Sequence, residues 1–150
     1  MTGWKDLIGA LGVVLSLLFV GFEVRQNTRA LQATVRNDLT AASREYLLAQ
    51  STSPELSTAY ELWASGGESS PVQDRMVMTS TMALIRNIEN VYLQAELGTI
   101  DSEVVGMFGL TSPIFQSAKF RAFWESSARA SVDPGFAEAF DTANGFQGRE

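Results

Sequence analysis

Residues 7–22 read LIGALGVVLSLLFVGF, without one charged side chain. The hydrocarbon core of a bilayer is about 30 Å thick and takes roughly 20 helical residues to cross, so this run is slightly short. Trp4 is suited to the membrane interface, and the long side chains of Lys5 and Arg25 can reach out of the hydrocarbon, which lengthens the usable span. The sequence therefore predicts one transmembrane helix, with residues 1–25 as the anchor.

Two other structures contain such a run. A cleaved signal peptide requires small residues three and one positions before the cut, and residues 20–25, VGFEVR, offer no such pair. A buried core helix of a soluble protein stays open as an alternative. Basic residues are more numerous after the run than before it, so the positive-inside rule places the N-terminus outside and the following residues in the cytoplasm. These basic residues are Arg25, Arg29, Arg36 and Arg44.

The apolar run passes into a second helical pattern without a turn signal. Over residues 23–50, apolar side chains recur at three- and four-residue steps, which is the period of an amphipathic helix. We expect the membrane helix to continue as a helical stalk over residues 26–50. The apolar positions of this stripe are Val24, Leu31, Val35, Leu39, Ala42 and Tyr46.

Helix boundaries can be placed from capping residues. Ser53, followed by Pro54, is a helix start, and the Gly66-Gly67 pair is the corresponding stop. Ser70 and Gln73 have the spacing of a capping box, and the helix that they open is expected to run to Gly98. Later helices are expected from residue 101 or 102, with a disturbance near residue 113, then around residues 120–124, and from residue 134.

Because hairpin turns with alternating apolar residues are absent, the predicted fold class is all-α. One N-terminal transmembrane helix continues into a stalk, and residues 51–143 form a small helical cytoplasmic domain. Residues 144–150 are expected to be a frayed tail.

Composition excludes several kinds of chemistry. The 150 residues include 17 acidic and 11 basic side chains, with no histidine and no cysteine. Disulfides, thiolate nucleophiles, the usual zinc sites and every Ser-His-Asp arrangement are therefore ruled out. The net charge of −6 argues against nucleic acid as a partner. The sequence indicates no catalytic residue, no cofactor and no metal.

Two segments carry a resemblance. Residues 23–31, EVRQNTRAL, directly follow the apolar helix, and residues 86–94 read RNIENVYLQ. They resemble the "QNTxAL" and "RxxENxYxQ" motifs of a group of small, uncharacterised bacterial single-pass membrane proteins. The resemblance implies a bacterial inner membrane location and the same architecture, and it implies no activity.

The membrane-proximal half offers two candidate contact surfaces. Gly9, Gly12 and Ser16 share one face of the predicted helix, and small residues of this kind let a second membrane helix approach closely. Trp4 and the segment after the run are suited to lipid headgroups or to a neighbouring polypeptide, with simple topology marking as the alternative. The residues of that segment are Arg25, Gln26, Asn27 and Arg29.

The C-terminal half offers two further clusters. Arg86, Glu89 and Asn90 share a helix face, and we expect a structural polar network that fixes packing against the stalk. An exposed ion pair and a catalytic carboxylate at Glu89 are the alternatives. A second cluster is aromatic and is expected to be either core or a docking surface for a partner. Its residues are Phe120, Phe123 and Trp124.

These features favour a binding function. The leading hypothesis is a non-catalytic accessory or assembly subunit of a larger bacterial membrane complex, in contact with membrane lipid and with other subunits. A homo-oligomeric membrane-anchored scaffold is the first alternative, and a carboxylate-dependent enzyme at the membrane surface is the second.

Overall fold

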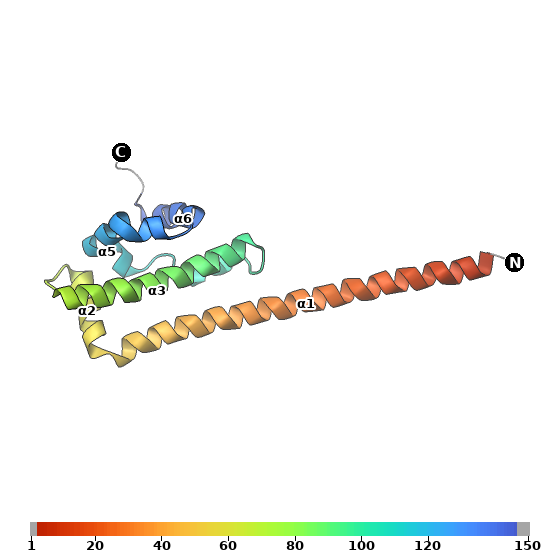
Figure 1. The fold of residues 1–150 in the computed structure, drawn as a ribbon, viewed down its shortest axis with the longest axis horizontal. Coiled ribbons are helices and arrows are strands. Elements are labelled where there is room, and N and C mark those ends of the chain that lie inside the picture. The colour runs from red at the N-terminus through yellow and green to blue at the C-terminus, as the bar shows by residue number, and fades with distance from the viewer. Residues whose placement is uncertain (1–2, 147–150) are drawn as a thin grey trace.

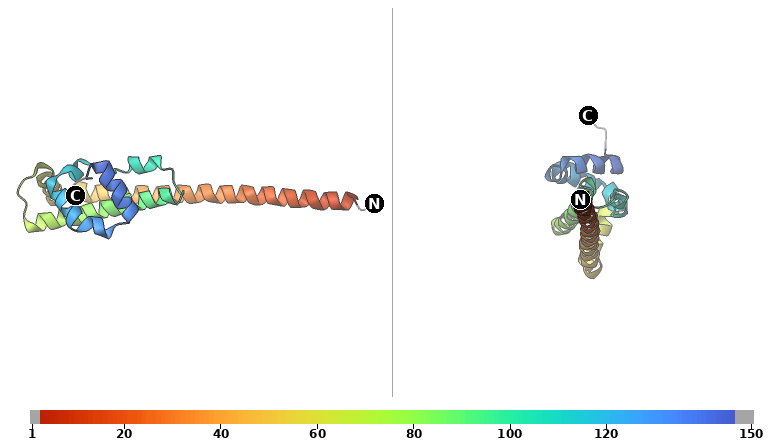
Figure 2. Two further views of the ribbon diagram at one scale, coloured as in Figure 1. Left: turned by 90° about the horizontal axis from the view of Figure 1, so that it is seen from above. Right: turned by 90° about the vertical axis from the view of Figure 1, so that its right-hand side faces the viewer.

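The computed structural model describes residues 3–146 and is all-α, as predicted (Figure 1). A long helix, α1, forms an arm, and the shorter helices gather beside its C-terminal part (Figure 2). The elements in chain order are α1 (Gly3–Thr52), α2 (Pro54–Ser65), α3 (Pro71–Glu96), α4 (Glu103–Met107), the 3₁₀ turn η1 (Pro113–Gln116), α5 (Ala118–Phe123), the π-helical turn η2 (Trp124–Ala128), the 3₁₀ turn η3 (Arg129–Ser131) and α6 (Pro134–Asn144).

Helix α1 is 50 residues long and has no break between the apolar run and the stalk. Its N-terminal half stands alone, whereas its C-terminal part packs against α2 and α3 (Figure 1). Leu39 is 2 % exposed in this contact. The predicted stripe is only partly correct, because Val24 and Leu31 lie before the point where α3 reaches α1, and Ala42 lines an open groove beside α3. All three side chains are exposed.

The capping residues act as predicted. The Ser53 hydroxyl accepts from the Leu56 N–H at the start of α2, and the capping box of Ser70 and Gln73 opens α3. Gly66 ends α2 with φ +73°, a left-handed conformation that glycine adopts without strain. These boundaries form where the sequence places them because each capping contact joins residues only a few positions apart.

The core of the domain is aromatic. Five rings from η1, α5, η2 and α6 are fully buried, and the Trp124 and Phe140 ring centroids lie 4.5 Å apart. Helix α3 supplies the aliphatic floor on which these rings pack. The buried rings are Phe115, Phe120, Trp124, Phe136 and Phe140.

The C-terminal end of the domain is packed further than predicted. Asn144 is 5 % exposed, and its amide donates to the Leu110 and Phe140 carbonyls at 3.0 and 2.9 Å. Phe146 packs against the core. The predicted tail is therefore wrong for residues 144–146, because the amide and ring have partners that the sequence does not reveal. Residues 147–150 lie outside the described residues.

Candidate functional site

The best-formed polar cluster lies where α1 enters the domain. The Tyr46 hydroxyl of α1 lies 2.9 Å from the Tyr60 hydroxyl of α2, which lies 3.0 Å from the Thr81 hydroxyl of α3. Gln50 donates its amide to the Tyr46 oxygen at 2.8 Å. This junction cluster, Tyr46, Gln50, Tyr60 and Thr81, joins three helices. No pattern in the sequence predicts it, because the hydroxyls come together only when the helices pack.

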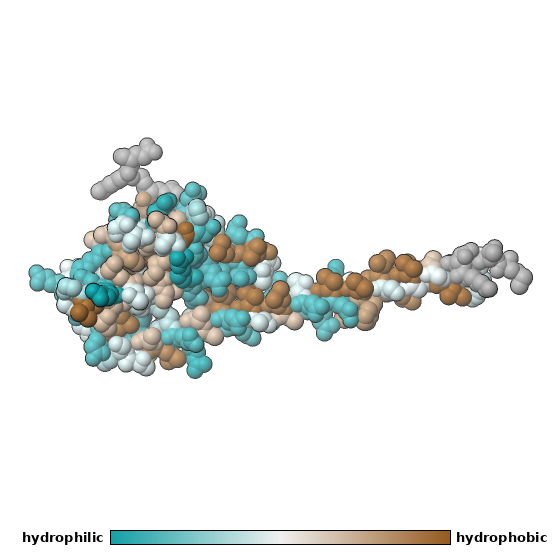
Figure 3. Space-filling model, viewed as in Figure 1, coloured by the Kyte–Doolittle hydropathy of each residue, from teal (hydrophilic) through white to brown (hydrophobic). Residues whose placement is uncertain are grey.

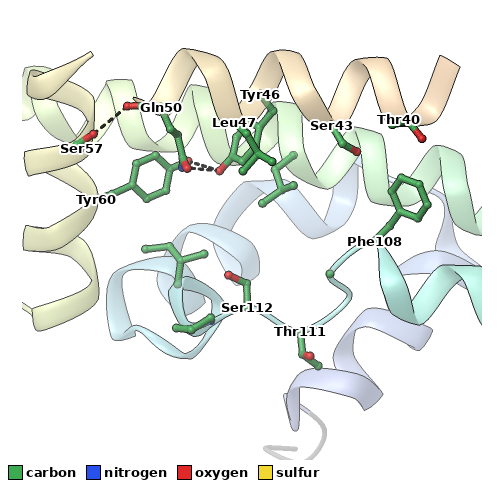
Figure 4. A pocket seen from close by; sticks show the side chains of 14 residues that line it. Thr40, Ser43, Tyr46, Leu47, Gln50, Ser57, Tyr60, Phe108, Thr111 and Ser112 are labelled. Carbon is green, nitrogen blue, oxygen red and sulfur yellow. Dashed lines mark hydrogen bonds between the residues drawn. The ribbon is translucent and has the colours of Figure 1, made fainter. Parts of the chain in front are cut away.

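A cavity of about 720 Å³ opens beside the junction cluster. Figure 4 shows the Tyr46 and Gln50 side chains of α1 meeting the Tyr60 ring of α2 at one end of it. None of the lining side chains carries a charge, and the volume falls in the range of about 300–1,000 Å³ that small-molecule sites occupy. The lining residues are Thr40, Ser43, Tyr46, Leu47, Gln50, Ser57, Tyr60, Leu84, Phe108, Gly109, Thr111, Ser112, Pro113 and Ile114.

The environment of this cavity determines the protonation state of Tyr46. Burial, reinforced by the neighbouring Tyr60, raises the pKa of Tyr46 well above its usual value of 10.0. The phenol therefore stays protonated at physiological pH and acts as a neutral hydrogen-bonding group. A general base needs a pKa near the working pH, which Tyr46 does not have.

The predicted network on α3 forms in part and in a different place. The Arg86 guanidinium donates to Glu89 at 2.7 Å and to the Ser131 carbonyl at 2.5 Å. The other Glu89 oxygen accepts from the Asp133 backbone N–H at 2.6 Å. The network thus ties α3 to the turn before α6 and not to the stalk, which corrects the prediction.

Asn90 takes no part in that network. Its side chain is exposed, because it lies one position beyond the buried face that carries Glu89. A side-chain hydrogen bond from α3 to the stalk comes from Asn87 instead, whose amide donates to the Ser43 hydroxyl at 2.9 Å. Helix α3 therefore does contact the stalk, but through Asn87 and not through the predicted network.

Two buried tryptophans are each bound by an aspartate. Trp63 donates to Asp74 at 2.7 Å, and Trp124 donates to Asp141, also at 2.7 Å. Asp141 in turn accepts from the Arg129 guanidinium at 2.8 Å. An indole N–H inside a core needs an acceptor, so the tryptophans could have signalled such partners, although not which residues supply them.

For the aromatic cluster, the structure supports the core alternative at two of the three residues and not the docking surface. Phe120 and Trp124 are fully buried and belong to the core. Phe123 alone of the three remains partly exposed, and it lines a groove of about 940 Å³ between α3 and the C-terminal segment. Phe123 is the residue directly before the π-helical turn of η2.

The candidate residues of the apolar arm have no contact with the domain. No side chain of the described residues comes within 4 Å of a Cβ built on Gly9 or Gly12. The Ser16 hydroxyl donates to the Gly12 carbonyl at 2.9 Å, so this small-residue face presents no unsatisfied polar group. Trp4 and the segment after the run are exposed as well: Arg25, Gln26, Asn27 and Arg29. Their roles remain predictions.

Comparison with known proteins identifies no relative. No protein family, no curated protein and no solved structure matches the chain. Within the described residues, no group of three or more acidic side chains is placed to hold a metal ion. The function therefore has to be inferred from the residues themselves and from their arrangement.

Proposed function

We propose that this chain is a non-catalytic accessory or assembly subunit of a larger bacterial membrane complex, anchored by the N-terminal part of α1. The observation that carries the proposal is the continuity of α1, which runs from a fully exposed apolar segment straight into the domain. The domain would lie on the cytoplasmic side, as the excess of basic residues after the run indicates.

The exposed apolar side chains support the anchor. One helix within the described residues is long and apolar enough to cross a membrane, and none of its most apolar window is buried. Side chains such as Leu17, Phe19 and Phe22 are each more than 60 % exposed. Transfer of one such side chain from water to an apolar phase contributes about 1.5–3 kcal/mol. A lipid environment is therefore strongly favoured for this arm.

The same continuity argues against a signal sequence. A cleavage within residues 20–25 would cut through the middle of a regular helix, and these residues lack the small side chains that cleavage requires. The buried core helix is disfavoured too, since the arm has no partner among the described residues.

Because α1 is unbroken, it also sets the distance between the domain and the membrane surface. From Val24 to Gln32, where side chains of α1 begin to be shielded, the helix rises only about 12 Å. The domain is thus held close to the membrane surface without a flexible linker. This arrangement suits a subunit that presents a helical surface to a neighbour in the same membrane.

The polar groups of the domain support binding over catalysis. Both Glu89 oxygens are engaged, one by Arg86 and one by the Asp133 N–H. The Tyr46 phenol is held protonated. The carboxylate oxygens of Glu89 thus already have partners within the domain, and a protonated phenol cannot act as a base, which weakens the carboxylate-enzyme alternative.

The proposal can be tested on the tagged full-length chain purified in a mild detergent, with native mass spectrometry of what co-purifies. We expect other subunits in a fixed ratio, and we expect Gly12→Leu to lose them because a bulky side chain separates the helices. Gly21→Leu is the matched control, since Gly21 lies on a different face and is equally open. A chain that purifies as a discrete self-assembly would support the homo-oligomeric scaffold instead. If both variants retain or lose the other subunits equally, the small-residue face has no specific role in binding them.

A further inference from the structure

The end of α3 carries the most exposed apolar side chain of the domain. Leu97 is 76 % exposed, more than any other large apolar side chain of the described residues, and Leu93, one turn earlier, is 36 % exposed. Helix α3 runs antiparallel to α1, so this end points back toward the apolar arm (Figure 1). Figure 3 shows apolar surface at this end of the domain. An apolar tip here has no function in the domain core, from which it points away.

The position of this tip along the axis of α1 can be estimated from contacts between α1 and α3. Asn87 bonds to Ser43, and ten residues along each helix from that contact bring Leu97 level with about residue 33 of α1. A small cavity confirms the register, because residues 99–101 and residues 32–37 line it together. Leu97 therefore lies about 14 Å beyond Val24 along the arm.

The apolar run is shorter than the hydrocarbon core, so the bilayer extends past the end of the run toward Leu97. Sixteen uncharged residues, 7–22, span about 24 Å of a hydrocarbon core that is about 30 Å thick. A bilayer centred on this run covers the arm from about residue 5 to about residue 24, which leaves Leu97 about 13 Å from the hydrocarbon edge. The headgroup layer occupies about 5–8 Å of that distance. A leucine side chain and a modest tilt of the helix cover the rest.

We propose that the tip formed by Leu93 and Leu97 inserts into the headgroup layer as a second lipid contact. This inference rests on the proposed function, because it requires α1 to span the bilayer. The arm alone fixes the height of the domain but leaves its tilt and rotation free. A second contact point sets both, so that one face of the domain is consistently turned toward a neighbouring subunit.

The charges around the tip indicate the class of lipid. Glu96 and Asp101 lie close to it in the chain, and two basic residues of α1 lie within about 6 Å of its level along the helix axis. Of these, Arg36 lines the same small cavity as Asp101. Opposite charges thus offset one another at this end of the domain. The contact is therefore apolar in origin and is expected in zwitterionic phosphatidylcholine without anionic lipid. The two basic residues are Arg29 and Arg36.

The absence of cysteine makes a direct test available. Single variants Leu97→Cys, Val72→Cys and Val14→Cys of the full chain are labelled with an environment-sensitive fluorophore and reconstituted into phosphatidylcholine vesicles. Collisional quenching by lipids with a nitroxide on the headgroup or high on the acyl chain is then measured. Val72 is the matched control, because it is 67 % exposed and lies at the opposite end of α3, about 37 Å away.

We expect the label at residue 97 to be quenched several-fold more strongly than the label at residue 72, and to emit at shorter wavelength. Equal quenching at residues 97 and 72, with strong quenching at residue 14, would overturn the second contact and leave the anchor intact. No quenching at residue 14 would overturn the anchor and the second contact together. Quenching at residue 97 that disappears as the chain is diluted in lipid would assign the tip to a second copy and would also overturn the proposal.

Discussion

The two ends of the chain contain the same apolar residue types, but these side chains are exposed in the N-terminal arm and buried in the C-terminal region. Phe19 in the arm is 62 % exposed, whereas Phe140 in α6 is fully buried. The difference comes from spacing. In the arm, apolar residues occupy every face of the helix, and no other element covers them. In the C-terminal region, they recur on one face between polar residues, so that short helices can bury them against each other and against α3. Residue composition alone therefore does not separate an anchor from a core.

The largest effect is expected from a matched pair of phenylalanines. Phe140→Ala removes a ring in contact with Trp124, Phe115 and other aromatic side chains, and we expect a loss of about 3–5 kcal/mol in the free energy of unfolding of the domain. Phe19→Ala is expected to leave that free energy unchanged, because this ring touches nothing in the domain. Urea unfolding of both full-length variants in nonionic detergent, followed by near-ultraviolet circular dichroism, measures the difference. Similar losses in both would mean that the arm and the core are not independent.

A smaller effect is expected from the polar contact that holds the aromatic segment on α3. Glu89→Ala leaves the Asp133 N–H without its acceptor and Arg86 without its ion pair. We expect this change to cost about 1–3 kcal/mol, because a partly buried donor is left unsatisfied. Glu96→Ala on the same helix is the control, since Glu96 is exposed, and it should stay within about 0.5 kcal/mol of the parent chain. The urea midpoints of the two variants test this expectation. Equal midpoints would show that the network does not contribute to the stability of the domain.

Features that depend on residues close together in the chain were predictable from the sequence. The caps at Ser53 and Ser70 and the stop at Gly66 were predictable because each depends on residues within one helical turn. The length and continuity of α1 followed from its composition and period. These are properties of the local chain.

Features that depend on distant residues were not predictable. Glu89 finds its second partner 44 positions away in the chain, and periodicity gives no information about which segment will pack there. The stalk stripe shows the same limit, since Val24 and Leu31 have the right period but lie before the point at which α3 covers α1. The junction cluster was missed for this reason too, because each of its hydroxyls comes from a different helix.

The smallest effect is expected from a change of pH, which should alter the stability of the domain but not that of the arm. Hydrogen bonds from Ser69 and Trp63, together with the nearby Lys119 ammonium, hold the pKa of Asp74 below its usual value of 3.8. A carboxyl whose pKa is lower in the folded than in the unfolded chain stabilises the fold above the unfolded pKa. That contribution is lost as the pH falls from about 4 through the folded pKa.

The parent chain should therefore lose stability between pH 5 and pH 3 more steeply than Asp74→Asn, whose amide oxygen can still accept from Trp63 but cannot titrate. Urea midpoints at several pH values over this interval give the two slopes. Asp74 is partly exposed, with 38 % of its side-chain surface accessible, so solvent screening keeps the difference small. Identical slopes would show that Asp74 does not titrate differently in the folded and unfolded chains. The helical content of the arm should not change over this interval in either variant, because its stability depends on the apolar environment rather than on this carboxylate.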